Sequence, residues 1–320
     1  MTPTVEAPSV SSETSSASVS LHATSCAICE TLGNAVELYP ANFSEDAFNA
    51  AIFSARRLPD RIHGRIVRCD FCGLVRSDPT VDTEVLARLY AQSSFDYGDE
   101  ISGLQKTYGK YLRKLKLFGG QKGSLLEIGC GNGFFLQEAK RQGYKIVRGV
   151  EPSTQACNQA PRSIKANIVC DIMRTGVFEP DSFDAICLFQ VFDHIPEPNA
   201  LLQECFSVLK PGGLILFLNH NVDSVSAKLL GAKSPIIDLE HTYLYSPRTL
   251  MRITQKHGFR VRSFGAVWNI YSLHYLVRLL PLPSSFKKPL LRKLQQNAIG
   301  KIQFPAPLGN LYLIAQKPKP

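Results

Sequence analysis

The chain has 320 residues, of which 44% are hydrophobic and 20% are charged, and this is the composition of an ordinary globular protein. The length is sufficient for one large hydrophobic core and a smaller module. The sequence has no run of eighteen apolar residues, which excludes a helix that spans a membrane. Residues 1–25 are rich in Ser, Thr and Ala but lack the basic start and apolar stretch of a signal peptide, so they predict a disordered tail.

The formal net charge of +9 is distributed unevenly along the chain. Residues 241–320 contain 13 Lys and Arg and no acidic residue, whereas residues 1–240 carry 23 basic and 27 acidic residues. Such a positive block indicates an anionic partner, which would be a phosphate-bearing substrate, a membrane surface or a nucleic acid. The alternative is a basic surface with no specific partner.

Four of the nine cysteines form two Cys-x-x-Cys pairs, Cys26 with Cys29 and Cys69 with Cys72. This spacing is typical of zinc knuckles, and four thiolates would form a closed, structural Zn²⁺ site. The 39 residues between the pairs exceed the usual spacing, so the loop must hold an insertion. His63 is either an alternative ligand or a loop residue. The odd cysteine total, with the other five cysteines in predicted elements or turns, favours a reducing compartment and hence a cytoplasmic protein.

The predicted elements begin with two helices, at 82–90 and 101–118, and two glycines end the second. Strands are expected at 124–129, 146–150, 165–170, 183–189, 213–219, 259–268 and 310–315, and further helices at 134–142, 153–160, 199–209 and 247–257. Alternation of strands and helices predicts crossover units around a parallel sheet. The fold class is therefore α/β, with a Rossmann-like, seven-stranded, mostly parallel sheet and helices on both faces.

The most informative segment is the glycine turn that follows the strand at 124–129. Gly129, Gly131 and Gly133 occupy every second position, and helical spacing follows. Strand, glycine turn and helix bring backbone N–H groups close to a nucleotide. A dinucleotide fingerprint would need glycine at Phe134. Glu127 repels a pyrophosphate but attracts a cationic amino-acid group, which favours S-adenosylmethionine (SAM) over NAD. The segment resembles motif I of the class I SAM-dependent methyltransferases.

This resemblance covers residues 95–270 and implies roles for residues at the ends of the next strands. Glu151 would accept the ribose hydroxyls, Asp171 the adenine amino group, and Ile172 would lie under the base, while Gln190 would line the methionine side. The family also implies a final antiparallel strand in a hairpin, which here would carry a helical insertion of about forty residues.

Methyl transfer from a sulfonium is an in-line displacement, so the protein aligns the acceptor and removes its proton. Histidine titrates near neutrality and suits this task. His241 and His194 are the leading candidates, and His220 is a weaker one. The competing interpretations are that His194 only packs the loop and that His241 binds substrate without moving a proton. Asp193 would orient His194, and other candidate neighbours are Asn219, Glu240, Tyr243 and Tyr245.

The layout of a cysteine module before a methyltransferase core resembles bacterial methyltransferases that act on nucleotide-linked deoxysugars and relatives in surface-polysaccharide metabolism. It implies a small, anionic acceptor, such as a nucleotide sugar or glycan precursor. An RNA acceptor is disfavoured because residues 26–78 hold six Arg and seven acidic residues and are near neutral. A membrane-surface or lipid-linked acceptor is the other alternative, since residues 271–294 mix Leu and Tyr with basic residues. The predicted domains are a tail (1–25), a zinc-binding module (26–78), a SAM-binding core with N-terminal helices (79–269), and a basic insertion with the last strand (270–320).

Overall fold

The structure is a computed structural model, and it describes residues 21–42, 62–93, 100–279 and 282–320. Its centre is a seven-stranded sheet in the order β12-β15-β10-β9-β6-β7-β8. The strands are β6 (Ser124–Ile128), β7 (Ile146–Val150), β8 (Ile168–Val169), β9 (Phe183–Phe189), β10 (Leu209–His220), β12 (Arg260–Ala266) and β15 (Asn310–Gln316). The last strand, β15, lies antiparallel between β10 and β12, and the other pairs are parallel. This architecture confirms the predicted fold class.

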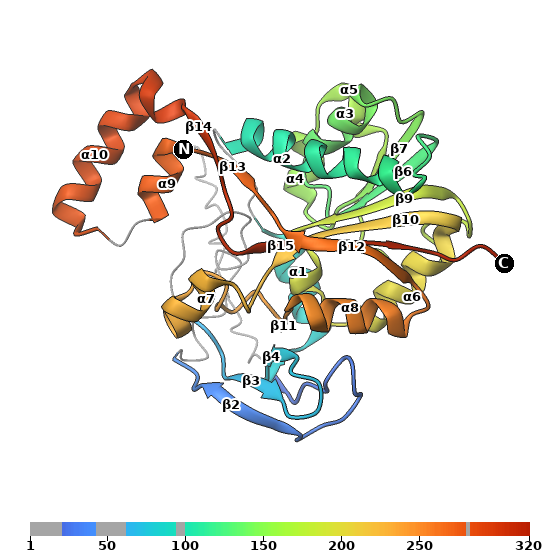
Figure 1. Ribbon diagram of the computed structural model, residues 1–320, viewed down its shortest axis with the longest axis horizontal. Helices are drawn as coiled ribbons and strands as arrows, with labels where there is room; N and C mark the ends of the chain where they lie inside the picture. The colour runs from blue at the N-terminus through green and yellow to red at the C-terminus, as the bar shows by residue number, and fades with distance from the viewer. Residues whose placement is uncertain (1–20, 43–61, 94–99, 280–281) are drawn as a thin grey trace, which may run out of the picture.

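Helices cover both faces of the sheet (Figure 1). Their bounds are α2 (Ile101–Lys114), α3 (Phe134–Arg141), α4 (Thr154–Gln159), α5 (Arg162–Lys165), α6 (Pro198–Val208) and α8 (Pro247–Lys256). Alternate residues of one strand point to opposite faces. Leu125 therefore packs with the α2, α3 and α5 side chains, whereas its neighbour Leu126 packs with those of α6 and α8.

Most predicted elements occur with shifted ends. The strand expected at 165–170 contains only Ile168–Val169, because α5 occupies the residues before it. The helix expected at 101–118 changes to a 3-10 turn, η3 (Leu115–Phe118), and ends at the left-handed Gly119. The sequence pattern could not locate these changes, since hydrophobic spacing is similar in short helical turns and buried strands.

The N-terminal part is joined to the core through shared sheets. Strand β1 (Leu21–His22) pairs with β5 (Thr80–Val81), and a second sheet has the order β11-β4-β3-β2. Its strands are β2 (Ala35–Tyr39), β3 (Ile66–Cys69), β4 (Val75–Ser77) and β11 (Tyr243–Leu244), and helix α1 (Thr83–Ala91) follows the N-terminal part. Leu21 and His22, which the sequence analysis placed in the tail, form β1, and residues 1–20 lie outside the described residues. The second sheet also crosses the predicted boundary at residue 78, because β11 belongs to the core segment.

The segment between β12 and β15 forms a projecting unit. It contains β13 (Asn269–Ser272), α9 (Leu273–Leu279), α10 (Ser284–Gln296), η6 (Ala298–Lys301) and β14 (Gln303–Ala306). The two helices match the expected helical insertion, and the β13–β14 ribbon that closes it was not predicted. Within the described ranges, none of the helices is long and apolar enough to cross a bilayer.

Candidate active site

The glycine turn after β6 requires glycine for steric reasons. Gly129, Gly131 and Gly133 have φ values of 70°, 54° and 76°, in the left-handed region that other residues rarely adopt. A Cβ atom at Gly129 would collide with the side chain of Val191, in the loop after β9. The turn and this loop are therefore in direct contact, which places the residues after β9 beside the glycines.

Two side chains at the ends of the strands beside this turn each have a buried oxygen atom without a hydrogen-bond partner among the described residues. The two atoms are Oε2 of Glu127, near the end of β6, and Oε1 of Gln190, at the end of the neighbouring strand β9. Burial and the charge of Glu151 raise the pKa of Glu127 well above its usual value. Unpaired buried acceptors are costly, so these two atoms indicate a ligand that donates hydrogen bonds.

Glu151 is buried and already holds the turn together. Its Oε2 accepts a hydrogen bond from the Gly131 N–H (2.8 Å), and its Oε1 accepts one from the Ser153 N–H (2.9 Å). Burial raises the pKa of Glu151, although these two hydrogen bonds favour the charged form and lower the pKa in part. The sequence had suggested only a ligand role for this acid, and the structure adds this structural one.

Asp171 and Ile172 follow β8. Asp171 Oδ2 forms an ion pair with Arg174 (2.7 Å), and Asp171 Oδ1 accepts a hydrogen bond from the backbone N–H of Ile172 (2.7 Å). The side chain of Ile172 is 45% exposed although it is a large aliphatic group. An exposed apolar platform beside a carboxylate is compatible with binding of a flat base.

Three histidines from three segments converge next to the loop after β9. The ring centroids of His194 and His241 are 4.5 Å apart, and those of His220 and His241 are 4.8 Å apart. His194 ends the short turn η4 (Phe192–His194), His220 ends β10, and His241 precedes β11. The structure therefore brings together all three histidines that the sequence singled out.

Burial of the rings and the nearby carboxylates determine the charges in this cluster. Burial alone would lower the pKa of His241. Asp238 Oδ1 lies 2.8 Å from His241 Nδ1, and its negative charge outweighs the effect of burial and raises the pKa of His241 to about 9. Burial and the charge on His241 together lower the pKa of His194 to about 3. At neutral pH His194 is therefore neutral, and the pair carries one positive charge, on His241.

Asp193 orients His220 rather than His194. Its Oδ2 accepts hydrogen bonds from Nδ1 (2.8 Å) and the backbone N–H (3.1 Å) of His220, and its Oδ1 accepts one from Asn219. Burial alone would raise the pKa of Asp193, but His220 and the charge on His241 lower it. The expectation that Asp193 orients His194 was therefore wrong, because Asp193 contacts His220.

The sequence analysis missed Tyr90 and Asp238 as members of the site. Tyr90, on α1, has its hydroxyl 3.1 Å from His194 Nδ1 and 3.3 Å from the carbonyl oxygen of Glu240. Asp238 accepts hydrogen bonds from the backbone N–H groups of Glu240 and His241. Tyr90 is 104 residues from His194, so no local pattern could have paired them. The spacing of Asp238 three residues before His241 was a usable signal.

The chain matches the family described as "Methyltransferase domain" over residues 102–263. This range is half of the chain and contains the glycine turn, Glu127, Glu151 and the loop after β9. The chain belongs to this family. It is a class I SAM-dependent methyltransferase.

Named relatives of this methyltransferase include the ubiquinone biosynthesis O-methyltransferase of Neisseria meningitidis serogroup C (strain 053442), 26% identical over 166 residues that cover 47% of this chain and 70% of the relative. The corresponding protein of Paraburkholderia xenovorans (strain LB400) is 27% identical over 166 residues, which cover 48% and 71%. Among solved structures, geranyl diphosphate C-methyltransferase from Streptomyces coelicolor A3(2) is similar with a TM-score of 0.45 and 16% identity over 66% of this chain and 76% of that chain.

The methyltransferase also contains a cluster of its four paired cysteines. Sγ atoms of Cys26 and Cys72 are 3.4 Å apart and those of Cys29 and Cys69 are 4.0 Å apart. All four lie within 4.8 Å of one another, and the edges of a tetrahedral zinc–thiolate site measure about 3.8 Å. Burial opposes ionisation of Cys69, but the backbone N–H groups of Cys72 and Phe71 outweigh it and lower the pKa of its thiol to about 7. The distances between the four thiol groups therefore fit a zinc ion.

Two further groups bear on metal binding. His63 is not a member of the cysteine cluster, and its Nδ1 is 2.8 Å from the carbonyl oxygen of Gly64. Asp193, His220 and His241 also offer ligand atoms within 4.8 Å of one another. In this second group the carboxylate of Asp193 accepts hydrogen bonds from Asn219 and His220.

Proposed function

We propose that this methyltransferase transfers the methyl group of SAM to an oxygen or carbon atom of a small, anionic acceptor, such as a nucleotide sugar or glycan precursor. The observation that carries the proposal is the convergence of His194, His220 and His241 beside the loop that contacts the glycine turn. The charged His241 and the acid-free segment 241–320 favour a negatively charged acceptor. The O-methyltransferase names of the relatives support an oxygen acceptor.

Bound SAM supplies an electrophilic methyl group on a sulfonium sulfur, so the protein mainly aligns the acceptor and removes its proton. We assign His241 to hold the acceptor oxygen, because a charged imidazole stabilises negative charge that develops there. We assign His194 as the proton acceptor, because it is the neutral imidazole of the pair and a negatively charged acceptor beside it would raise its pKa from about 3. The Tyr90 hydroxyl donates to the Glu240 carbonyl, so it accepts the Nδ1–H of His194 and leaves Nε2 as the basic atom.

The cofactor contacts in this proposal follow from the polar groups around the turn. Glu127 and Gln190 would receive the amino-acid end of SAM, because their buried oxygen atoms have no partner in the described structure. Glu151 would accept the ribose hydroxyls with the lone pairs that Gly131 and Ser153 leave free. Asp171 and Ile172 would hold the adenine, which requires the Arg174 ion pair to rearrange.

The experiment for this function uses the purified chain, deuterated-methyl SAM and a panel of acceptors, read by mass spectrometry. The panel holds nucleotide sugars, glycan precursors, hydroxylated quinone precursors and RNA. Methylation of a small acceptor that His241→Gln abolishes and His22→Gln preserves is the expected result, since His22 is an exposed histidine in β1. Methylation of RNA and of no small acceptor would contradict the proposal and would identify RNA as the acceptor.

The cysteine cluster is proposed as a structural zinc site, with Cys26, Cys29, Cys69 and Cys72 as ligands. Four protein ligands leave no open position for chemistry. The cluster packs into the same hydrophobic core as α6 and α8, and Lys256 of α8 donates a hydrogen bond to the carbonyl oxygen of Ala27 (2.9 Å). Elemental analysis of the purified chain should give one zinc per protein, and Cys29→Ser should lose it.

A further inference from the structure

Helix α10 presents an unusual surface for a helix at the edge of a globular protein. It packs on α9 and η6 and stands apart from the helices that cover the sheet (Figure 1). Its half-buried residues Leu291 and Leu294 lie on the side towards these neighbours, whereas Phe286 is 73% exposed and Leu290 is 39% exposed. Packing within the chain therefore leaves two large apolar side chains of α10 in water.

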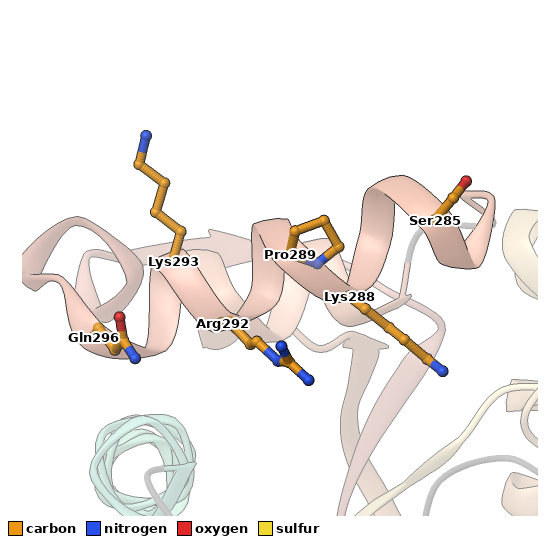
Figure 2. A pocket seen from close by; sticks show the side chains of 6 residues that line it. All are labelled: Ser285, Lys288, Pro289, Arg292, Lys293 and Gln296. Atoms are coloured by element: carbon orange, nitrogen blue, oxygen red, sulfur yellow. The ribbon is translucent and has the colours of Figure 1, made fainter.

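The outward face of the same helix is basic. Ser285, Lys288, Pro289, Arg292, Lys293 and Gln296 line a shallow hollow on it (Figure 2). Lys288 and Arg292 point to one side of the helix and Lys293 points to the other. These three cations form no ion pair with the described residues, and residues 241–320 contain no acid. Because one helix lines this hollow, it does not form an enclosed site for a small molecule.

A second exposed apolar group lies next to the histidine cluster. Helix α7 (Val225–Leu230) begins five residues after His220, and its Val225 and Leu229 are 76% and 81% exposed. The Asn221 N–H donates to the carbonyl oxygen of Gly309 (2.8 Å), which ties the start of α7 to the segment that leads from the insertion into β15. The exposed group on α7 therefore lies on the segment that follows His220, and this hydrogen bond links that segment to the residues after the insertion that carries α10.

The combination of exposed aliphatic and aromatic side chains with unpaired cations favours one kind of partner. Phosphate groups on RNA or on a free anion would satisfy the cations but would give aliphatic side chains no place to leave water. An anionic bilayer offers both, since its headgroups attract Lys and Arg while its acyl region receives Phe and Leu. We infer that α10 and α7 dock this methyltransferase on the surface of an anionic phospholipid membrane, with the histidine cluster close to the lipid.

This inference goes beyond the proposed chemistry and does not depend on the identity of the acceptor. It requires two separable contributions, one from charge and one from apolar burial. Each Lys or Arg near an anionic surface adds to binding, so neutralising three of them should weaken it by about tenfold or more. Replacing the apolar side chains should weaken binding even when the charge is unchanged.

The test is co-sedimentation of the full chain with phosphatidylcholine vesicles, with and without about 30% phosphatidylglycerol. Binding is expected only with the anionic lipid. It should weaken by tenfold or more in the triple variant Lys288→Gln, Arg292→Gln, Lys293→Gln, and also in the pairs Phe286→Ser with Leu290→Ser and Val225→Ser with Leu229→Ser. A matched triple control, Lys116→Gln, Lys145→Gln, Arg148→Gln, removes three exposed cations elsewhere and should bind like the unchanged chain.

Titration of SAM into each variant, followed by calorimetry, shows that the fold is retained and separates this inference from the proposed function. A chain that binds SAM but does not sediment with anionic vesicles would overturn the membrane surface and leave methyl transfer untouched. Binding that the charge variant abolishes but both apolar pairs preserve would also overturn it. The surface would then be a simple polyanion site, and RNA added as a competitor would displace the vesicles.

Discussion

The hydroxyl of Ser77 donates a hydrogen bond to the backbone carbonyl oxygen of His241, over 3.0 Å. The Ser77 N–H donates to the carbonyl oxygen of the next residue, Thr242 (3.0 Å), and β4 pairs with β11 immediately after it. Ser77 lies five residues after Cys72, so the cysteine module is bonded directly to the backbone that carries the charged histidine. The position of the His241 backbone therefore depends on the folded cysteine module.

This contact between Ser77 and His241 predicts that loss of zinc lowers the turnover of the acceptor more than it lowers the affinity for SAM. We expect Cys29→Ser, or removal of zinc by a chelator, to lower kcat by about tenfold or more, because β4 would no longer hold the backbone of His241. SAM affinity should change by less than about threefold, since its proposed ligands lie on or after β6, β7, β8 and β9 of the central sheet, to which β4 and β11 do not belong. Steady-state kinetics and SAM calorimetry measure the two effects, and added zinc should restore the chelated protein. Equal losses of kcat and of SAM affinity would contradict the prediction.

The second prediction concerns Glu127 and the amino group of SAM. Glu127→Gln should weaken SAM binding by about 10- to 100-fold, because a buried hydrogen bond between charged groups contributes about 1.5–3 kcal/mol. The pKa of Glu127 is raised, so in the unchanged chain SAM affinity should increase as rising pH removes its proton. Calorimetric titrations across pH should show this slope, and Glu127→Gln should flatten it. Glu84→Gln, an exposed acid in α1, is the control, and an unaltered affinity in Glu127→Gln would remove Glu127 from the cofactor site.

The third prediction is an alkaline limit on activity that Asp238 controls. His241 is charged below its pKa of about 9, so activity that needs its charge should fall as the pH rises through that value. Asp238→Asn removes the carboxylate that raises this pKa and keeps an oxygen for the backbone N–H groups of Glu240 and His241. The alkaline limb of kcat should therefore move to lower pH. A limb that stays near pH 9 in this variant would assign it to another group.

The sequence predicted those parts of the site whose residues are consecutive in the chain. The strand before Gly129, the glycines themselves and the helix after them are consecutive, so their pattern predicts both the fold and the position of the turn. The same is true of the two cysteine pairs, whose spacing predicted the observed cluster. Glu127 and Gln190 could also be placed, because neighbouring parallel strands end at the same edge of a sheet.

Contacts between distant segments were beyond a local pattern. The pairing of Asp193 with His220 instead of His194 depends on where β10 ends, and hydrophobic spacing does not determine that end to one residue. The docking of β11 on β4 joins residues that are more than 160 positions apart. The charge on His241 depends in turn on Asp238 and on burial, both of which require the folded chain.

The last prediction separates Tyr90 from a merely structural role. In the structure its hydroxyl lies between His194 Nδ1 and the Glu240 carbonyl oxygen, and the proposed mechanism needs this contact to keep the His194 hydrogen on Nδ1. Tyr90→Phe retains the ring, which packs edge-to-face on His194, and removes only the hydroxyl. We expect kcat to fall by about tenfold or more while SAM affinity and thermal stability stay close to those of the unchanged chain, because neither depends on the tautomer. Tyr39→Phe, which removes a hydroxyl on β2 in the N-terminal sheet, is the matched control and should leave kcat unchanged. A Tyr90→Phe enzyme with full kcat would show that His194 is not the proton acceptor in the tautomer assigned to it.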